Sequence, residues 1–141
     1  MAGFLEPLSI REIPGDNRRW ILLEPCVYVL KSLKGDEWVD AEIGFITDFG
    51  SIPRLLWSFP GLSPFGKYRR AYVIHDKLFI APVVRTVTLS ERVIDFTEAN
   101  DILIEAMQVL GAGWFLRKVI WLGVRFGGKV VWNRYREKEN E

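Results

Sequence analysis

Hydrophobic and polar residues alternate in the first third of the chain, as is typical of strands. The alternation is most regular between residues 38 and 45, where Val39, Ala41, Ile43 and Phe45 share one face. This spacing predicts a strand that is buried on one side. The polar turn at residues 34–37 predicts that it forms a hairpin with the preceding aliphatic stretch.

That aliphatic stretch, residues 20–30, is itself expected to be a strand, and Pro25 indicates an edge or a bulge within it. The mixture of apolar and polar residues at positions 4–13 predicts an opening strand. The turn-forming residues at positions 14–17 predict where that strand ends. Residues 83–90 are short and β-branched and predict one further hairpin arm.

Three longer segments have the apolar spacing of helices, at residues 68–80, 96–110 and 114 to about 134. The second has Asp95 or Thr97 as its expected N-cap and a glycine at its end. The third is expected to be weakened at its paired glycines, residues 127 and 128. A short helix capped by Ser51 is expected between the strands and the first long helix.

The predicted strands come first along the chain and most of the helices follow, and this order predicts an α+β fold. We expect N-terminal antiparallel strands, including a hairpin, to pack against about three C-terminal helices. A length of 141 residues fits a single domain. Residues 1–133 are assigned to this domain, and residues 134–141, a run of mixed charge, to a C-terminal tail.

Composition excludes several classes of protein. Nineteen basic residues against 18 acidic ones give a net charge of +1, which does not favour a nucleic-acid partner. The most apolar segment, residues 113–132, contains four cations, and this argues against a membrane span. A single cysteine excludes an intramolecular disulfide. The first residues lack the features of a secretory signal, and with a single cysteine we expect synthesis in a reducing cytosol.

Candidate chemistry begins with His75, which is the only histidine. In a helix it shares a face with apolar residues such as Ala71 and Phe79, so it is either a satisfied core residue or part of a site. Asp76 lies about 100° further round the helix and could orient a neighbour or cap a backbone group. Asp48 follows a strand, where it could bind a ligand or hold an Asx turn.

The last predicted helix carries an uncommon stripe. Four cations and three tryptophans fall within about a third of its circumference: Arg117, Lys118, Arg125, Lys129, Trp114, Trp121 and Trp132. One interpretation is a binding surface in which Lys118, Trp121, Arg125 and Trp132 contact a partner. The other is that long cationic side chains cover tryptophan rings at the rim of the core.

Two motifs carry a resemblance to a known family. The segment Gly44-Phe45-Ile46-Thr47-Asp48-Phe49-Gly50-Ser51-Ile52-Pro53-Arg54 and the later His75-Asp76-Lys77-Leu78-Phe79 resemble the signature of an uncharacterised family of phage and prophage proteins, the domain of unknown function DUF1353. Its pattern continues with Ala-Asp on a following helix, which appears here as Ala99-Asn100-Asp101. The resemblance implies phage origin and a shared site at Asp48, His75 and Asp76. It supplies no activity.

We therefore expect a virion- or tail-associated structural or assembly protein with a buried Asp/His polar site. Its expected partners are other phage proteins, and it is expected in the host cytoplasm on synthesis and then in the virion. The sequence leaves the oligomeric state open.

The alternative is a small phage hydrolase, directed at the cell wall. Its catalytic residues would be His75, Asp76 and Asp48, with His75 as general acid or base. A divalent metal ion is the only cofactor indicated, and Asp48, His75 and Asp101 would hold it. Against this, metal hydrolases of this kind use further histidines that the chain lacks. Periodicity also places Asp101 opposite the apolar stripe of its helix, on a solvated acidic face.

Overall fold

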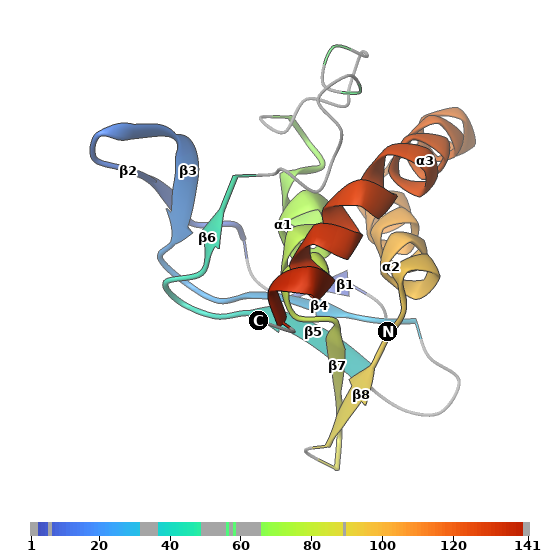
Figure 1. Ribbon diagram of the computed structural model, residues 1–141, viewed down its shortest axis with the longest axis horizontal. Helices are drawn as coiled ribbons and strands as arrows, with labels where there is room; N and C mark the ends of the chain where they lie inside the picture. Colours follow the sequence, from blue (N-terminus) through green and yellow to red (C-terminus); the bar gives the residue numbers. More distant parts are fainter. Residues whose placement is uncertain are drawn as a thin grey trace.

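Two antiparallel sheets and three packed helices make up the part of the molecule that the structure describes (Figure 1). The structure is a computed structural model that describes residues 3–5, 7–31, 37–48, 56, 58, 66–88 and 90–139. The predicted α+β class is confirmed, with the first six strands preceding the helices in the described chain. Residues 34–36 of the expected turn and the short helix at Ser51 lie outside the described residues, while Glu37 is already the first residue of a strand.

The larger sheet has the strand order β1-β4-β5-β7-β8, and every neighbouring pair is antiparallel. Its strands are β1 (Gly3–Phe4), β4 (Cys26–Val29), β5 (Glu37–Ala41), β7 (Val83–Thr86) and β8 (Glu91–Val93). The expected hairpin is present, because β4 pairs with β5 and Tyr28 lies opposite Val39. Both of these side chains are buried.

The smaller sheet has the order β2-β3-β6, formed by β2 (Ile10–Ile13), β3 (Asp16–Leu22) and β6 (Ile46–Thr47). Two predicted strands are therefore wrong in extent. Residues 4–13 form two short strands in different sheets, and residues 20–30 are broken between β3 and β4. Pro25 lies immediately before β4, and because proline lacks an amide hydrogen it interrupts the pairing there.

The strand predicted to reach Phe45 ends at Ala41. A turn follows in which Gly44 has a φ of 87°, a conformation that favours glycine. The turn breaks the alternation, so Ile43 is 64% exposed while Phe45 is buried. It also redirects the chain from the larger sheet into β6 of the smaller one.

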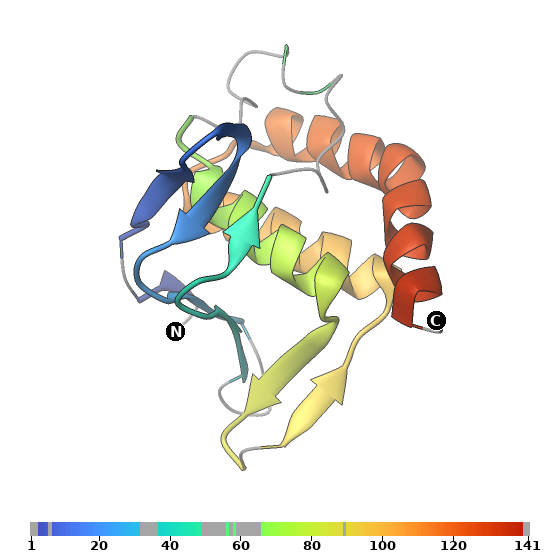
Figure 2. The same ribbon diagram turned by 60° about the vertical axis from the view of Figure 1, so that its left-hand side comes forward.

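Helix α1 (Arg69–Ile80) is the centre of the fold. It contacts β4, β5 and β6 on one side and α2 and α3 on the other (Figure 2). Eight of its twelve residues are buried: Ala71, Tyr72, Val73, Ile74, His75, Asp76, Leu78 and Phe79. A helix enclosed in this way buries its polar side chains as well as its apolar ones.

Helix α2 (Phe96–Val109) starts and stops as predicted. The Asp95 side chain accepts a hydrogen bond from the Glu98 amide at 2.8 Å, and Gly111 has a φ of 99°. The predicted solvated acidic face is only partly right. Asp101 is exposed, but Glu105 is half-buried and accepts hydrogen bonds from the Tyr28 hydroxyl and from the backbone amide of Lys31, just after β4.

Helix α3 (Trp114–Glu139) is longer than predicted and continues past residue 134. It bends partway along its length around α1 and α2 (Figure 2). Near its end the Arg136 guanidinium donates to the carbonyl oxygens of Phe79 and, at 3.1 Å, Ile80. These carbonyls belong to the last turn of α1, where a cation is favourable. Nowhere in the described chain is a helix both long and apolar enough to cross a membrane.

Replacing Arg136 with glutamine is expected to lower the free energy of unfolding by about 1–2 kcal/mol, because the last carbonyls of α1 lose a charged donor. Urea denaturation followed by tryptophan fluorescence measures the change. Arg134→Gln is the matched control, since Arg134 is exposed. Equal unfolding curves for the two variants would show that the Arg136 contact contributes nothing to stability.

Candidate functional site

A buried polar cluster lies where α1 meets β6, α2 and α3. His75 and Asp76 are its centre, and they are 0% and 1% exposed. Adjacent residues on a helix point about 100° apart, so the two side chains face different elements. His75 contacts α2, and Asp76 contacts β6.

His75 is bonded to Asn100 of α2. The distance from His75 Nε2 to Asn100 Oδ1 is 2.8 Å, and the imidazole lies 4.3 Å from the Phe79 ring between centroids. Because an amide oxygen only accepts hydrogen bonds, Nε2 carries the proton and donates it. Burial lowers the pKa of His75 to about 4, and the hydrogen bond that His75 donates to Asn100 only partly offsets this. The imidazole is therefore neutral near pH 7.

Asp76 is bonded to Thr47 of β6. The Thr47 hydroxyl donates to Asp76 Oδ2 at 2.6 Å, and Thr47 is 1% exposed. Asp48, the next residue, is exposed. The pKa of Tyr135, near the end of α3, is raised first by burial and then by the negative charges of Asp76 and Asp48. Both carboxylates therefore lie within electrostatic range of Tyr135.

The proposed metal ligands do not converge in the same way. His75 faces Asn100, and Asp101, one position further round α2, is exposed. Burial and the neighbouring carboxylates Asp95 and Glu98 raise the pKa of Asp101. Across the described residues, no group of three or more histidine, cysteine, aspartate or glutamate side chains could hold a metal ion.

The predicted binding residues of α3 divide into two groups. Trp132 is 7% exposed and packs against Phe79 at 5.2 Å between ring centroids, so it belongs to the core. Trp121 is half-buried, and the cations of Lys118 and Arg125 lie 5.2 Å and 5.1 Å from its ring centroid. Lys118 and Arg125 therefore cover a tryptophan ring at the rim of the core, as the second interpretation predicts, although both cations are exposed.

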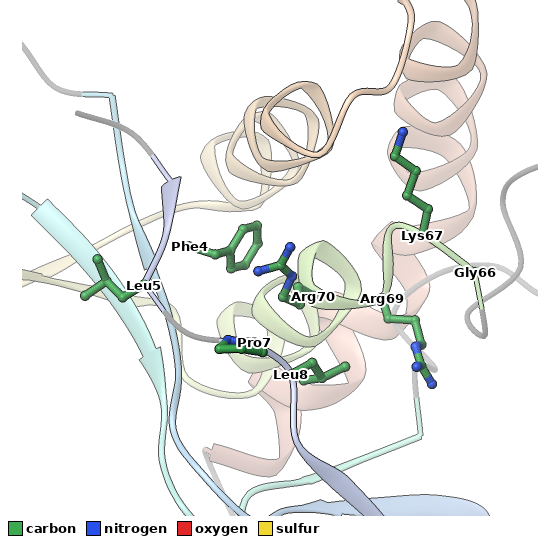
Figure 3. Close-up of a pocket in the computed structure, with 8 residues that line it drawn as sticks. All are labelled: Phe4, Leu5, Pro7, Leu8, Gly66, Lys67, Arg69 and Arg70. Carbon is green, nitrogen blue, oxygen red and sulfur yellow. The ribbon is translucent and has the colours of Figure 1, made fainter.

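Two cavities lie near these elements. One, of about 230 Å³, lies between α2 and α3 and is lined by Asn100 and Trp121 among others. The other, of about 550 Å³, lies at the start of α1 beside β1 (Figure 3). In it Arg70 stacks on Phe4 at 4.9 Å, while Lys67 and Arg69 point in other directions (Figure 3). The second cavity thus has cations that do not converge, and no signature residue lines it.

Sequence reasoning missed three members of the cluster: Thr47, Asn100 and Tyr135. Two of them carried a signal. Asn100 lies beside the apolar stripe of α2 in helical phase, and Thr47 follows the buried Phe45 at the spacing of a strand. Tyr135 carried none, because it falls in the run of mixed charge that is predicted to be a C-terminal tail.

A family model described as a protein of unknown function (DUF1353) matches residues 20–124 of the chain. The match includes the strands from β4 onward, α1, α2 and the first half of α3. Neither the comparison with curated proteins nor that with solved structures finds a match.

His75 is expected to make stability depend on pH. Its pKa is about 4 in the folded protein and about 6.5 when unfolded. Between these values the unfolded state binds the extra proton, so stability is full above pH 6.5 and falls as the pH drops toward 4. The loss reaches about 3 kcal/mol. Denaturant titrations at several pH values should show it, and His75→Gln should flatten this component; an equal slope in both proteins would contradict it.

Asn100→Asp is expected to raise the pKa of His75 above its ordinary value of about 6.5, because a carboxylate would then face the imidazole. The single histidine makes its imidazole signal in an NMR titration unambiguous. Asp101→Asn is the control and should leave the titration midpoint unchanged. A neutral imidazole at pH 5.5 in Asn100→Asp would show that residue 100 does not govern the proton on His75.

Proposed function

This chain belongs to the DUF1353 family of proteins of unknown function, and from that premise we propose that it is a bacteriophage structural or assembly protein, associated with the virion or its tail. It docks on an acidic surface of another phage protein. The motifs around Asp48 and His75, which resemble those of phage and prophage proteins, support the phage origin. The outward face of α3 supports docking.

One observation carries the proposal: α3 exposes a row of large apolar side chains. Phe115, Leu122, Phe126 and Val130, here called the outer stripe, are 57%, 41%, 75% and 62% exposed. At 3.6 residues per turn they fall within about a quarter of the helical circumference. A contiguous apolar row on a long helix is typical of an interaction surface.

The positive charge beside the outer stripe indicates what kind of partner binds there. Lys118, Arg125 and Lys129, here called the cationic flank, are exposed and lie along one edge of the outer stripe. No ion pair joins any of them to a carboxylate in the part of the chain that the structure describes. Arg85 and Arg92, by contrast, are paired with carboxylates at 2.8 Å. A partner with carboxylates beside an apolar row complements both features.

A second copy of this chain is a poorer occupant. In a two-fold symmetric pair of antiparallel helices, each flank meets the same flank of the other copy. The cationic flank would then face itself, and like charges across an interface are unfavourable. The surface is therefore better matched to a different, acidic protein.

The buried polar cluster supports a structural role. His75 and Asp76 connect α1 to α2 and to β6 through the two buried hydrogen bonds. Buried polar groups that are bonded in this way favour one arrangement of the elements over others. We assign the cluster the task of holding the helices so that α3 presents its outer stripe.

The hydrolase alternative has one observation in its favour, which is that the exposed Asp48 lies, like Asp76, within electrostatic range of Tyr135. It has two against it. The imidazole of His75 is fully buried, and its Nε2 is occupied by Asn100. A general acid or base must reach the substrate, so docking is the better supported function.

Phe126→Ser is expected to deplete the protein from purified phage particles by about tenfold or more, because it removes an exposed aromatic anchor from the outer stripe. Quantitative mass spectrometry of particles from a phage that encodes the chain measures this. Val93→Ser is the matched control, since Val93 and Phe126 are both 75% exposed. Lys118→Glu should also deplete the protein, and Lys138→Glu should not.

Absence of the unaltered protein from particles would overturn the virion assignment. Equal recovery of Phe126→Ser and Val93→Ser would overturn the docking surface. Sedimentation that shows a dimer of the purified chain, lost in Phe126→Ser, would assign the surface to a second copy. Flotation with anionic vesicles would assign it to a lipid surface.

A further inference from the structure

The cavity between α2 and α3 is lined by aromatic, polar and cationic side chains. Phe96, Thr97 and Asn100 come from α2, and Trp121, Arg125 and Lys129 come from α3. No acidic side chain is among these lining residues. Its wall therefore has two cations, two hydrogen-bonding groups and two aromatic rings.

The two cations are held in place by the aromatic rings. The Arg125 guanidinium lies 5.1 Å from the centroid of the Trp121 ring, and the Lys129 ammonium lies 4.7 Å from that of Phe96. Cation–π contacts of this kind reduce the freedom of long side chains without neutralising them. Since neither cation has a carboxylate partner within the described ranges, both retain their full charge for a ligand.

Asn100 adds a donor that the fold does not use. It is 3% exposed, and its Oδ1 is bonded to His75. Its Nδ2 amide has no hydrogen bond to any described residue. Asn100 lines the cavity, so a ligand oxygen there would accept a hydrogen bond from this amide.

We propose that this cavity is a binding site for a single oxyanion group, a carboxylate or a phosphate. Arg125 and Lys129 neutralise its charge, and the Asn100 amide donates to one of its oxygens. A volume of about 230 Å³ is below the usual range for a whole drug-sized ligand, so the cavity admits one group. The rings of Trp121 and Phe96 form its apolar wall.

The carboxylates nearest in sequence do not fill this role. Glu98 is paired with Arg92 at 2.7 Å. The pKa of Asp101 is raised by burial and by Asp95 and Glu98, and no cation is among the causes. Neither Arg125 nor Lys129 forms an ion pair with Asp101, so both cations are left for an external anion.

The test is an NMR titration of the intact protein with three probes at matched ionic strength: sodium acetate, inorganic phosphate and sodium chloride. The signals to follow are the Trp121 indole N–H and the side-chain amide of Asn100. We expect saturable shifts of both with acetate or phosphate and none with chloride. A blocked glutamate amide, used as a fourth probe, separates the two sources, because it binds if the natural anion is a protein carboxylate and fails if only free phosphate fits.

Arg125→Gln with Lys129→Gln should weaken binding by about tenfold or more, because both charged donors are lost. Lys138→Gln, on the same helix but outside the cavity, should change it by less than about twofold. The proposal fails if no probe gives a saturable shift, if chloride gives the same shift, or if the double variant binds as well as the unaltered protein. Phe126→Ser should bind acetate or phosphate normally, so the failure of the docking surface and that of the cavity are distinguishable.

Discussion

The fold depends on one constraint: a helix enclosed on all sides must find a hydrogen-bond partner for each polar side chain that it buries. α1 carries His75 and Asp76 in succession, and both are almost completely excluded from solvent. Since adjacent side chains diverge, one partner cannot satisfy both. The structure supplies Asn100 from α2 and Thr47 from β6, so the two bonds fix α1 relative to a helix on one side and a strand on the other.

The position of α3 follows from the same central helix. Trp132 packs on Phe79 of α1, and the Arg136 guanidinium, 4.4 Å from the Trp132 ring, binds the carbonyls that end α1. One side of α3 is thereby committed to the core, and the other is left to carry exposed aromatic and aliphatic groups. The contacts that attach α3 to α1 therefore also determine which side of α3 is exposed.

Much of this fold could be predicted from the sequence, because local patterns determined it. Asp95 and Gly111 define the ends of α2 by capping alone, and the β4–β5 hairpin follows from alternation. The break before Pro25 could be suspected, but not the change of sheet, since extended backbone has the same local pattern in either sheet. The end of α3 was missed because its charged residues are typical of a solvated tail.

The candidate site was predictable as a location and not as a set of contacts. The motifs pointed to Asp48, His75 and Asp76; the last two are the centre of the buried cluster, and Asp48 lies within electrostatic range of Tyr135. Which residue of α2 reaches His75 depends on the rotation of that helix about its axis, and one position separates a buried amide from an exposed carboxylate. The apolar stripe of α2 indicates this rotation and places Asn100 nearer the core than Asp101, but it does not identify His75 as the partner of Asn100.

The contact of Arg136 with Phe79 joins residues 57 positions apart in the chain. During synthesis, α1 leaves the ribosome long before the cation that completes its last turn. Contacts between distant segments form late, because the intervening chain must first be ordered. The central helix is thus finished only when the end of the third helix arrives, and until then a nascent chain exposes the surface of Phe79 that Trp132 later covers. While such a chain is being synthesised, its exposed apolar surface makes it vulnerable to aggregation and to proteolysis.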